Sequence, residues 1–536
     1  MYFYTIFEVG DFFMELITQK VKQNIEKVQD TEQVTFDHDY VIKDNKPDVL
    51  RVVCQSGQVK VDEVKAVGEN IWVNGMIEFE VLYKGEGADS MEDSSGRVEA
   101  VKDVIPFQEK IVLEGICDGD TVRVYACLDD LAVGIINSRK LSVRGIINMD
   151  IYCEREEDTQ IAARVNEPGV EQLSDQVSIL ELGCSIRDII RIRNDVTLPK
   201  TKPNIWKLLS GLVDIRNLEY TYDRDRVTIT GETHACIVYL SEEQEICCFE
   251  TQENFSNEIR CDSENAGNLA WIRTQLTVQQ VEAENDYDGE PRQLSIELAL
   301  TVDGKVWCER SVDVLKDLYS VSCGIKPVYE KRPVCRLLMK NDTKCRILEQ
   351  MYRESGENRI LRICGTKTSA QIEQIKNTDG GILVTGVLTV NCINIVEDDN
   401  CPIEMHTDQV PFEQFVEIPG IDNRTYCEVN VQVDQVQVNL MDNSEYEIKS
   451  TVSINAIALQ QDMLDVITRV DEAEEAFNGS SEAGLVGYIV QKDDKMWDIA
   501  KKYHTTIDNI VAVNGLNSDN IQQNDRLIIA RMGKIC

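Results

Sequence analysis

Positive charge is scarce in this sequence. Lys and Arg number 55 against 94 Asp and Glu, which gives a formal net charge of −39. A protein that binds nucleic acid displaces counterions with a basic surface, and anionic lipids attract basic segments in the same way. The charge therefore argues against both classes of partner. We interpret the acidity as a well-solvated surface.

Catalytic motifs are also missing. The four histidines, His38, His234, His406 and His504, are far apart, so the sequence gives no support for a Ser-His-Asp or Cys-His pair. It contains no His-Glu-x-x-His and no phosphate-binding Gly-x-x-x-x-Gly-Lys. His234 and Cys236 would share one strand face, but packed cysteines beside a half-exposed histidine are the simpler interpretation. We predict no catalytic residue, no cofactor and no metal.

Targeting signals are not evident either. The first thirteen residues carry Glu8 and Asp11 and lack a basic region, and no apolar run approaches the ~20 residues of a membrane span. We therefore expect no membrane insertion. Met14 opens a more ordinary amphipathic start, and we expect the native protein to begin there; an N-terminal peptide that starts before Met14 would contradict this.

Cysteine is plentiful, but it lacks the spacing of a disulfide framework or a zinc ribbon. The chain has 18 cysteines and no Cys-x-x-Cys. Many of them lie among apolar residues, as Cys127, Cys236 and Cys392 do. We expect reduced, buried thiols in a reducing compartment.

Three markers recur along the chain. Lys46-Pro47 is repeated as Lys202-Pro203, and a weaker copy near Ile360 has lost both residues. The mid-strand glycines Gly75, Gly231 and Gly386 follow at intervals of 156 and 155 residues. A third marker follows each glycine at variable spacing, and it contains Phe107, Phe249 or Phe412. Matching offsets predict an internal triplication, and a glycine within a strand suggests a bulge or a close crossing of backbones.

The repeats show the alternation of β-strands. Residues 428–438 place an apolar side chain at every second position, which is typical of a sheet with one solvated face. We predict a mainly β chain with three tandem units, each a sandwich or an open barrel. We divide the chain into an N-terminal segment (1–35), three β-rich repeats (36–155, 196–315 and 356–462), two linkers with a helix (156–195 and 316–355), an acidic flexible linker (463–486) and a C-terminal unit (487–531).

Helices are expected in three places outside the repeats. The spacing of Leu16, Ile17, Val21 and Ile25 favours a helix over residues 14–33. Residues 170–190 and 345–353 are the candidate linker helices.

The C-terminal unit reads strand, helix, helix, strand. Met496, Ile499, Ala500 and Tyr503 form one apolar helical stripe. Thr505 or Thr506 can cap a second helix, and Asn514-Gly515 can end it. The ordered motif is Tyr488-x-Val490, Trp497-x-Ile499-Ala500-x-x-Tyr503, Asn514-Gly515-Leu516, Asn520-Ile521 and Leu527-x-Ile529. It resembles a LysM domain, a small βααβ module.

The LysM resemblance implies a binding role, most often for N-acetylglucosamine polymers such as peptidoglycan or chitin. In the family, two glycine-containing loops form the glycan groove. Here Asp493 and Asn524 stand at those glycines, and a side chain there obstructs a close ligand. We expect a weakened groove and a surface for a protein partner. Trp497 is either the anchor of that surface or a ring that completes the small core of the unit. The predicted binding residues are Asp493, Asp494, Lys495, Met496, Trp497, Asn514, Asn520, Ile521 and Asn524.

The whole chain resembles the SipL-type spore-coat morphogenetic proteins, because three glycine-marked repeats precede a C-terminal LysM. That resemblance implies an adaptor in the mother-cell cytoplasm, at the forespore surface or spore coat. It would bind the basement-layer ATPase SpoIVA through the LysM unit, much as SpoVID-type proteins do in other spore formers. Other coat proteins are further candidate partners.

Two other functions compete with this interpretation. A peptidoglycan-binding protein anchored at the cell wall or spore cortex would need an open groove and an export signal. A cell-wall hydrolase with a LysM targeting arm would need a catalytic repeat, and the three copies share no acid/base or nucleophile set.

Overall fold

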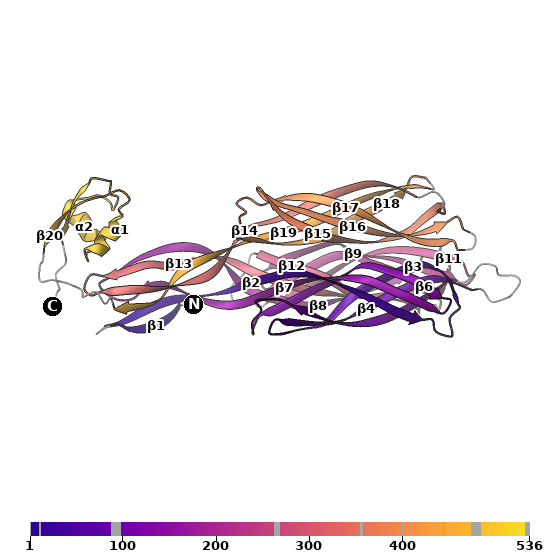
Figure 1. Ribbon diagram of the computed structural model, residues 1–536. Coiled ribbons are helices and arrows are strands. Elements are labelled where there is room, and N and C mark those ends of the chain that lie inside the picture. The colour runs from indigo at the N-terminus through magenta and orange to yellow at the C-terminus, as the bar shows by residue number, and fades with distance from the viewer. Residues whose placement is uncertain are drawn as a thin grey trace.

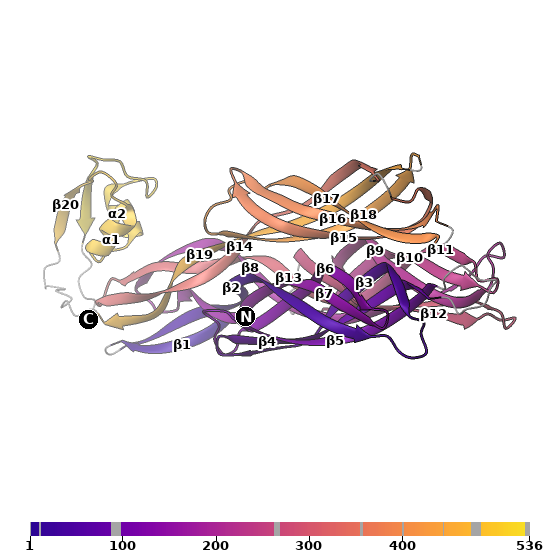
Figure 2. The same cartoon turned by 45° about the vertical axis from the view of Figure 1, so that its right-hand side comes forward.

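The computed structural model describes residues 2–9, 12–86, 98–261, 269–353, 357–398, 401–442, 444–472 and 484–530, with side chains from Met14 onward except at residue 472. Nearly all of the described chain is β-strand, and two short helices lie near the C-terminus. None of the helices in these residues is long and apolar enough to cross a membrane. Figures 1 and 2 show three packed β-units, narrow arms that extend from them, and the helical unit at the far end of the arms.

Each repeat contains six strands in two antiparallel sheets. The first repeat consists of β2 (Phe12–Val41), β3 (Val49–Val67), β4 (Asn70–Gly85), β5 (Val98–Val112), β6 (Thr121–Asn137) and β7 (Lys140–Val165). The second consists of β8 (Val170–Thr197), β9 (Ile205–Asp223), β10 (Arg226–Ser241), β11 (Ile246–Arg260), β12 (Leu269–Asn285) and β13 (Pro291–Ser320). The third consists of β14 (Ile325–Tyr352), β15 (Ile360–Thr378), β16 (Gly381–Val396), β17 (Ile403–Glu417), β18 (Thr425–Leu440) and β19 (Glu445–Glu472). The additional strand β1 (Tyr2–Val9) pairs with β2.

The same topology occurs three times. The second, third and fourth strands form one sheet, as in β3-β4-β5. The last strand lies between the first and the fifth in the other sheet, as in β2-β7-β6. One hydrophobic core in each repeat draws side chains from both sheets. The prediction of a mainly β chain is therefore confirmed, and each repeat is a sandwich.

The marker glycines sit at equivalent points of the three sandwiches. Gly75 lies opposite Phe107, and Gly386 lies opposite Phe412. Each glycine also adjoins a register shift in the pairing with the preceding strand, so the expected bulge is confirmed. The third marker was wrong in the second repeat, because Gly231 pairs with Phe255 and not with Phe249.

The predicted helices over residues 14–33, 170–190 and 345–353 are wrong. Apart from Arg353, which follows β14, these residues lie in β2, β8 and β14, whose outer halves pair with the ends of β7, β13 and β19 to form three long arms. The arms pack on one another through Val21, Val312, Val334 and other side chains. From Met14 to Ile25 β2 is buried on both faces, and it contains register shifts between Ile17 and Thr18 and between Glu26 and Val28. Such shifts break strict alternation, which explains why the apolar spacing resembled that of a helix.

The start of the expected flexible linker also belongs to one of the arms. Residues 463–472 belong to β19, so the linker prediction is wrong for them. Residues 473–483 lie outside the described part of the chain.

The cysteines largely follow the expectation of free thiols. Fifteen are free in the described residues. Cys54, Cys236, Cys248 and Cys364 help to fill an apolar junction where the three repeats meet. The exception is a disulfide between Cys184 and Cys261 within the second repeat, so the prediction of reduced thiols is wrong for that pair.

Candidate functional site

The C-terminal unit has the predicted βααβ order. β20 (Leu485–Ile489) pairs antiparallel with β21 (Arg526–Ala530), and α1 (Met496–Lys502) and α2 (Ile507–Asn514) lie between them. The apolar stripe of α1 packs with Ile510, Leu527 and Ile529 in a small core. The backbone N–H of Asn509 donates to the Thr506 hydroxyl at 3.0 Å, so Thr506 caps α2. Gly515 ends α2 with φ of 63°.

Two loops of this unit carry the substituted glycine positions. Asp493 and Asn524 have φ of 68° and 74°, the left-handed region in which glycine is unstrained. The Asn524 N–H donates to the Val490 carbonyl at 2.8 Å, so the two loops lie side by side. Both side chains are exposed. The loops thus keep a glycine-type backbone while they present an acidic and an amide side chain.

Trp497 is not exposed as an open anchor. It is only 8% exposed because α1 rests on the tip of β13. The Trp497 and Tyr319 rings meet edge to face with their centroids 4.9 Å apart. The Trp497 indole N–H donates to Asp317 Oδ2 at 2.8 Å. This face of the unit therefore already binds a protein surface, and the view in Figure 1 places α1 beside the end of the β13 arm.

Further polar contacts reinforce this seat of α1 and Trp497 on the tip of β13. The Lys501 ammonium lies 2.6 and 2.7 Å from the two Asp317 oxygens. The Tyr319 hydroxyl donates to the Thr505 carbonyl at 2.8 Å, and both residues are buried. Burial alone would raise the pKa of Asp317, but the hydrogen bonds from Lys501 and Trp497 outweigh it and hold the pKa below its ordinary value. Asp317 therefore faces α1 as a carboxylate at neutral pH.

The other predicted binding residues fall into two groups. Met496 is buried in the unit's core. Asp494 accepts hydrogen bonds from the Tyr488 hydroxyl and the Gln491 N–H, both at 2.7 Å. Asn514 bridges α2 to β21 through the Ile528 N–H and carbonyl. These three residues support the fold of the unit. The remaining ones are on its surface, Asp493, Lys495, Asn520 and Asn524 fully and Ile521 in part.

Asp317 and Tyr319 were not found from the sequence. They lie about 180 residues before α1 along the chain. No local motif marks them, since their role depends on where the β13 arm ends. Lys501 was also missed, although its position one helical turn after Trp497 places both side chains on one face of α1.

Comparison with known families gives matches over four parts of the chain. A family model described as SipL, SPOCS domain matches residues 48–136, 204–285 and 359–441. A LysM domain model matches residues 488–530. These matches fit a role at the spore coat or on peptidoglycan. No curated protein and no solved structure matches the chain.

Proposed function

Because the chain belongs to the SipL-type family, with three SPOCS domains followed by a LysM domain, we propose that it is a non-enzymatic adaptor of spore-coat assembly. Its three sandwiches form the scaffold, and its LysM unit docks onto a SpoIVA-like ATPase of the coat basement layer. The site of action is the forespore surface, on the mother-cell side. We infer the identity of this partner, the SpoIVA-like ATPase, from the resemblance to SipL-type proteins.

The observation that carries the proposal is the seat of Trp497 on β13. A LysM face that packs an aromatic ring on Tyr319 and bonds to Asp317 has the chemistry of a protein interface: a desolvated aromatic anchor with a paired charge beside it. A partner that takes this face would displace the arm. The exposed side chains of Asp493, Lys495 and Asn524 would then lie at the rim.

The proposal is tested by a pull-down from sporulating cells. Full-length protein and a chain lacking residues 485–536 serve as baits, and circular dichroism checks that the truncated chain keeps its β structure. We expect the ATPase with the full chain and not with the truncated one. Equal capture by both baits would place the docking surface in the repeats and contradict the proposal.

The second candidate is a peptidoglycan-binding protein, which the LysM match favours. The side chains of Asp493 and Asn524 at left-handed positions count against it. We predict that the full-length protein does not co-sediment with peptidoglycan or chitin. The matched variant Asp493→Gly/Asn524→Gly restores both glycines and shows whether the groove can be reopened. Micromolar binding of N-acetylglucosamine oligomers by the unaltered protein would favour this second function over the first.

A further inference from the structure

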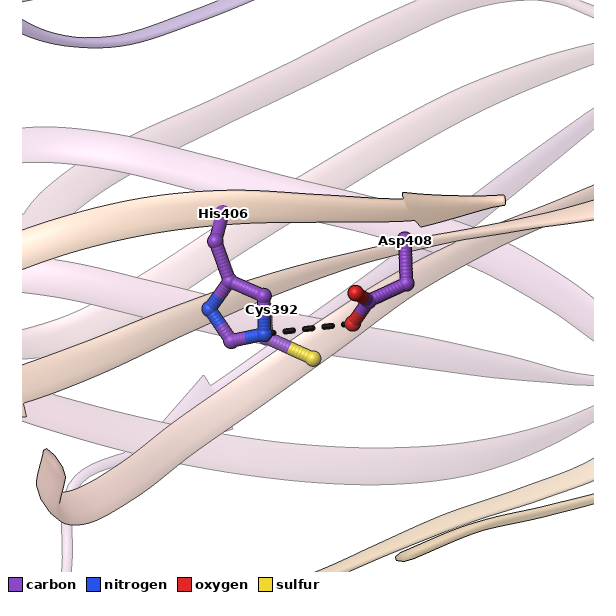
Figure 3. A group of neighbouring side chains, drawn as sticks. All are labelled: Cys392, His406 and Asp408. Carbon is purple, nitrogen blue, oxygen red and sulfur yellow. Dashed lines mark ion pairs between the residues drawn. The ribbon is translucent and has the colours of Figure 1, made fainter. Parts of the chain in front are cut away.

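A cluster of metal-ligand side chains lies inside the third repeat. Cys392 on β16 is the register partner of His406 on β17, and Asp408 follows two residues later on the same face. One ligand atom from each residue lies within 4.8 Å of the other two. The His406 Nε2 is 3.2 Å from Asp408 Oδ2. Figure 3 shows the Cys392 sulfur and this nitrogen turned toward the carboxylate.

The fold itself does not require polar residues at this place. The residues six positions after the marker glycines are Val81, Ile237 and Cys392. In the first repeat Val81 pairs with Val101, and in the second Ile237 pairs with Phe249. Two of the three sandwiches therefore fill this position with an apolar pair, and only the third has a thiol opposite an imidazole.

Two buried polar atoms of the cluster lack a well-formed hydrogen bond. Among the described residues Asn394 Oδ1 has no partner, and His406 Nε2 has only its 3.2 Å contact with Asp408 Oδ2, which is costly in an interior. The Asn394 amide nitrogen lies 2.6 Å from His406 Nδ1. The oxygen and nitrogen of an amide can exchange places by a flip. After that flip, Asn394 Oδ1 accepts the Nδ1 proton, and the Nε2 lone pair is directed at Cys392 and Asp408.

The surroundings hold the third ligand in place. The Tyr446 hydroxyl donates to Asp408 at 2.9 Å, and the Tyr446 ring stacks obliquely on His406 with centroids 5.0 Å apart. Outer contacts of this kind orient ligands in metal sites. Cys392 is fully buried, whereas the His406 and Asp408 side chains are 16% and 14% exposed, which leaves an approach from their side.

We propose that Cys392, His406 and Asp408 bind one zinc ion, with Asn394 and Tyr446 as supporting residues. A thiolate, an imidazole and a carboxylate together suit zinc, whereas calcium and magnesium prefer oxygen ligands alone. Ligands of a tetrahedral zinc are about 3.3–3.8 Å apart, given bonds of about 2.0–2.3 Å. Shifts of about an ångström therefore close the site, and water takes the fourth position. Binding releases the thiol proton to solvent.

The test is a cobalt and zinc titration of the full-length protein after chelator treatment. We expect one equivalent of zinc per chain by elemental analysis, and a thiolate-to-cobalt absorption band when cobalt is added. Cys392→Val restores the apolar residue type of the other repeats, so it should fold and lose both signals. His406→Phe should do the same. Cys345→Val, which changes another buried cysteine of this core, should keep them.

Two results would overturn the site. Unaltered protein that takes up neither metal would make the cluster a hydrogen-bonded interior network. Zinc uptake that survives in Cys392→Val would place the ion elsewhere. The titration of unaltered protein gives the first answer even when a variant does not fold.

Discussion

The marker glycines are explained by the residue that each one faces. A Cβ added at Gly386 would come within 2.6 Å of the Phe412 ring and would also collide with the Gln371 carbonyl. At Gly75 the corresponding clashes are with Phe107 and the Lys60 carbonyl. At Gly231 the nearest atoms all belong to side chains, with Phe255 closest at 2.8 Å.

We predict that Gly386→Val and Gly75→Val each lower the free energy of unfolding by about 3 kcal/mol, since a backbone carbonyl cannot move aside without loss of the ladder. Gly231→Val should cost less, about 1–2 kcal/mol, because the Phe255 ring can rotate away. Urea denaturation of the three variants measures this order. Gly134→Ala is the matched control, as its added Cβ meets nothing within 4 Å. Three neutral variants would show that the glycines have no packing role.

The roles of several individual residues could be predicted from the sequence. The triplication and the glycine bulges were readable because glycine has a distinct backbone role. The pairing of Gly231 with Phe255 could not be predicted from the sequence, because register is set by contacts across the sheet. The second repeat also contains Phe249, which the sequence pattern wrongly favours as the partner. Trp497 was identified from its place on α1, but its partners on β13 required the fold.

At the scale of elements, the long arms were the main failure of prediction. Some stretches of their strands are buried on one face and others on both faces, because each arm packs against the arms of the other repeats. Local spacing cannot show burial that comes from residues 150 or 300 positions away. The C-terminal unit was predicted correctly because its caps and apolar stripe are local features.

The contact between α1 and the β13 tip gives an element-scale prediction. Asp317→Ala removes the acceptor of Trp497 and the partner of Lys501. Since a buried donor is then left unsatisfied, we expect faster amide hydrogen exchange in α1 and at the end of β13, while exchange in the sandwiches stays unchanged. Asp313→Ala on the same strand is the control. Equal exchange in both variants would show that Asp317 does not secure the contact.

At the scale of the whole molecule, a buried ion cluster joins the three repeats. Lys305 of β13 lies 2.8 Å from Glu154 of β7 and 3.3 Å from Glu428 of β18. Glu26 of β2 adds a further carboxyl near this cluster. Burial and the negative charge of Glu428 raise the pKa of Glu26 to about 7, despite the opposing effect of Lys305.

This raised pKa predicts how stability changes with pH. Between pH 4.5 and 7 the folded chain holds the Glu26 proton more tightly than the unfolded chain does. The contribution of Glu26 to stability is therefore fully present below about pH 4.5 and is lost as pH rises through 7. Glu26→Gln removes the titration, so its gain in stability over the unaltered protein should grow by about 2–3 kcal/mol from pH 5 to pH 8.5.

Urea midpoints at the two pH values measure the gain. Glu32→Gln, an exposed change on the same strand, should show the same small effect at both. A gain from Glu26→Gln that does not depend on pH would mean that Glu26 is already ionised in the folded chain.

The three arms meet where the LysM unit is seated, so the whole molecule presents the unit at the end of a long scaffold (Figure 2). We propose that the Trp497 face is a protein-docking surface which β13 occupies until a partner takes it. An anchor of this kind commonly accounts for about 2 kcal/mol or more of binding free energy. Loss of Asp317 frees the face, whereas loss of Trp497 removes the anchor.

The most direct measurement is therefore capture of the coat ATPase from sporulating cells by four full-length baits: the unaltered protein, Trp497→Ala, Asp317→Ala, and Trp72→Ala as the control for loss of an indole elsewhere. Circular dichroism confirms that each bait is folded. Docking through Trp497 predicts that Trp497→Ala captures no ATPase, that Trp72→Ala captures as much as the unaltered protein, and that Asp317→Ala captures more. Capture by a folded Trp497→Ala at the unaltered level would contradict it.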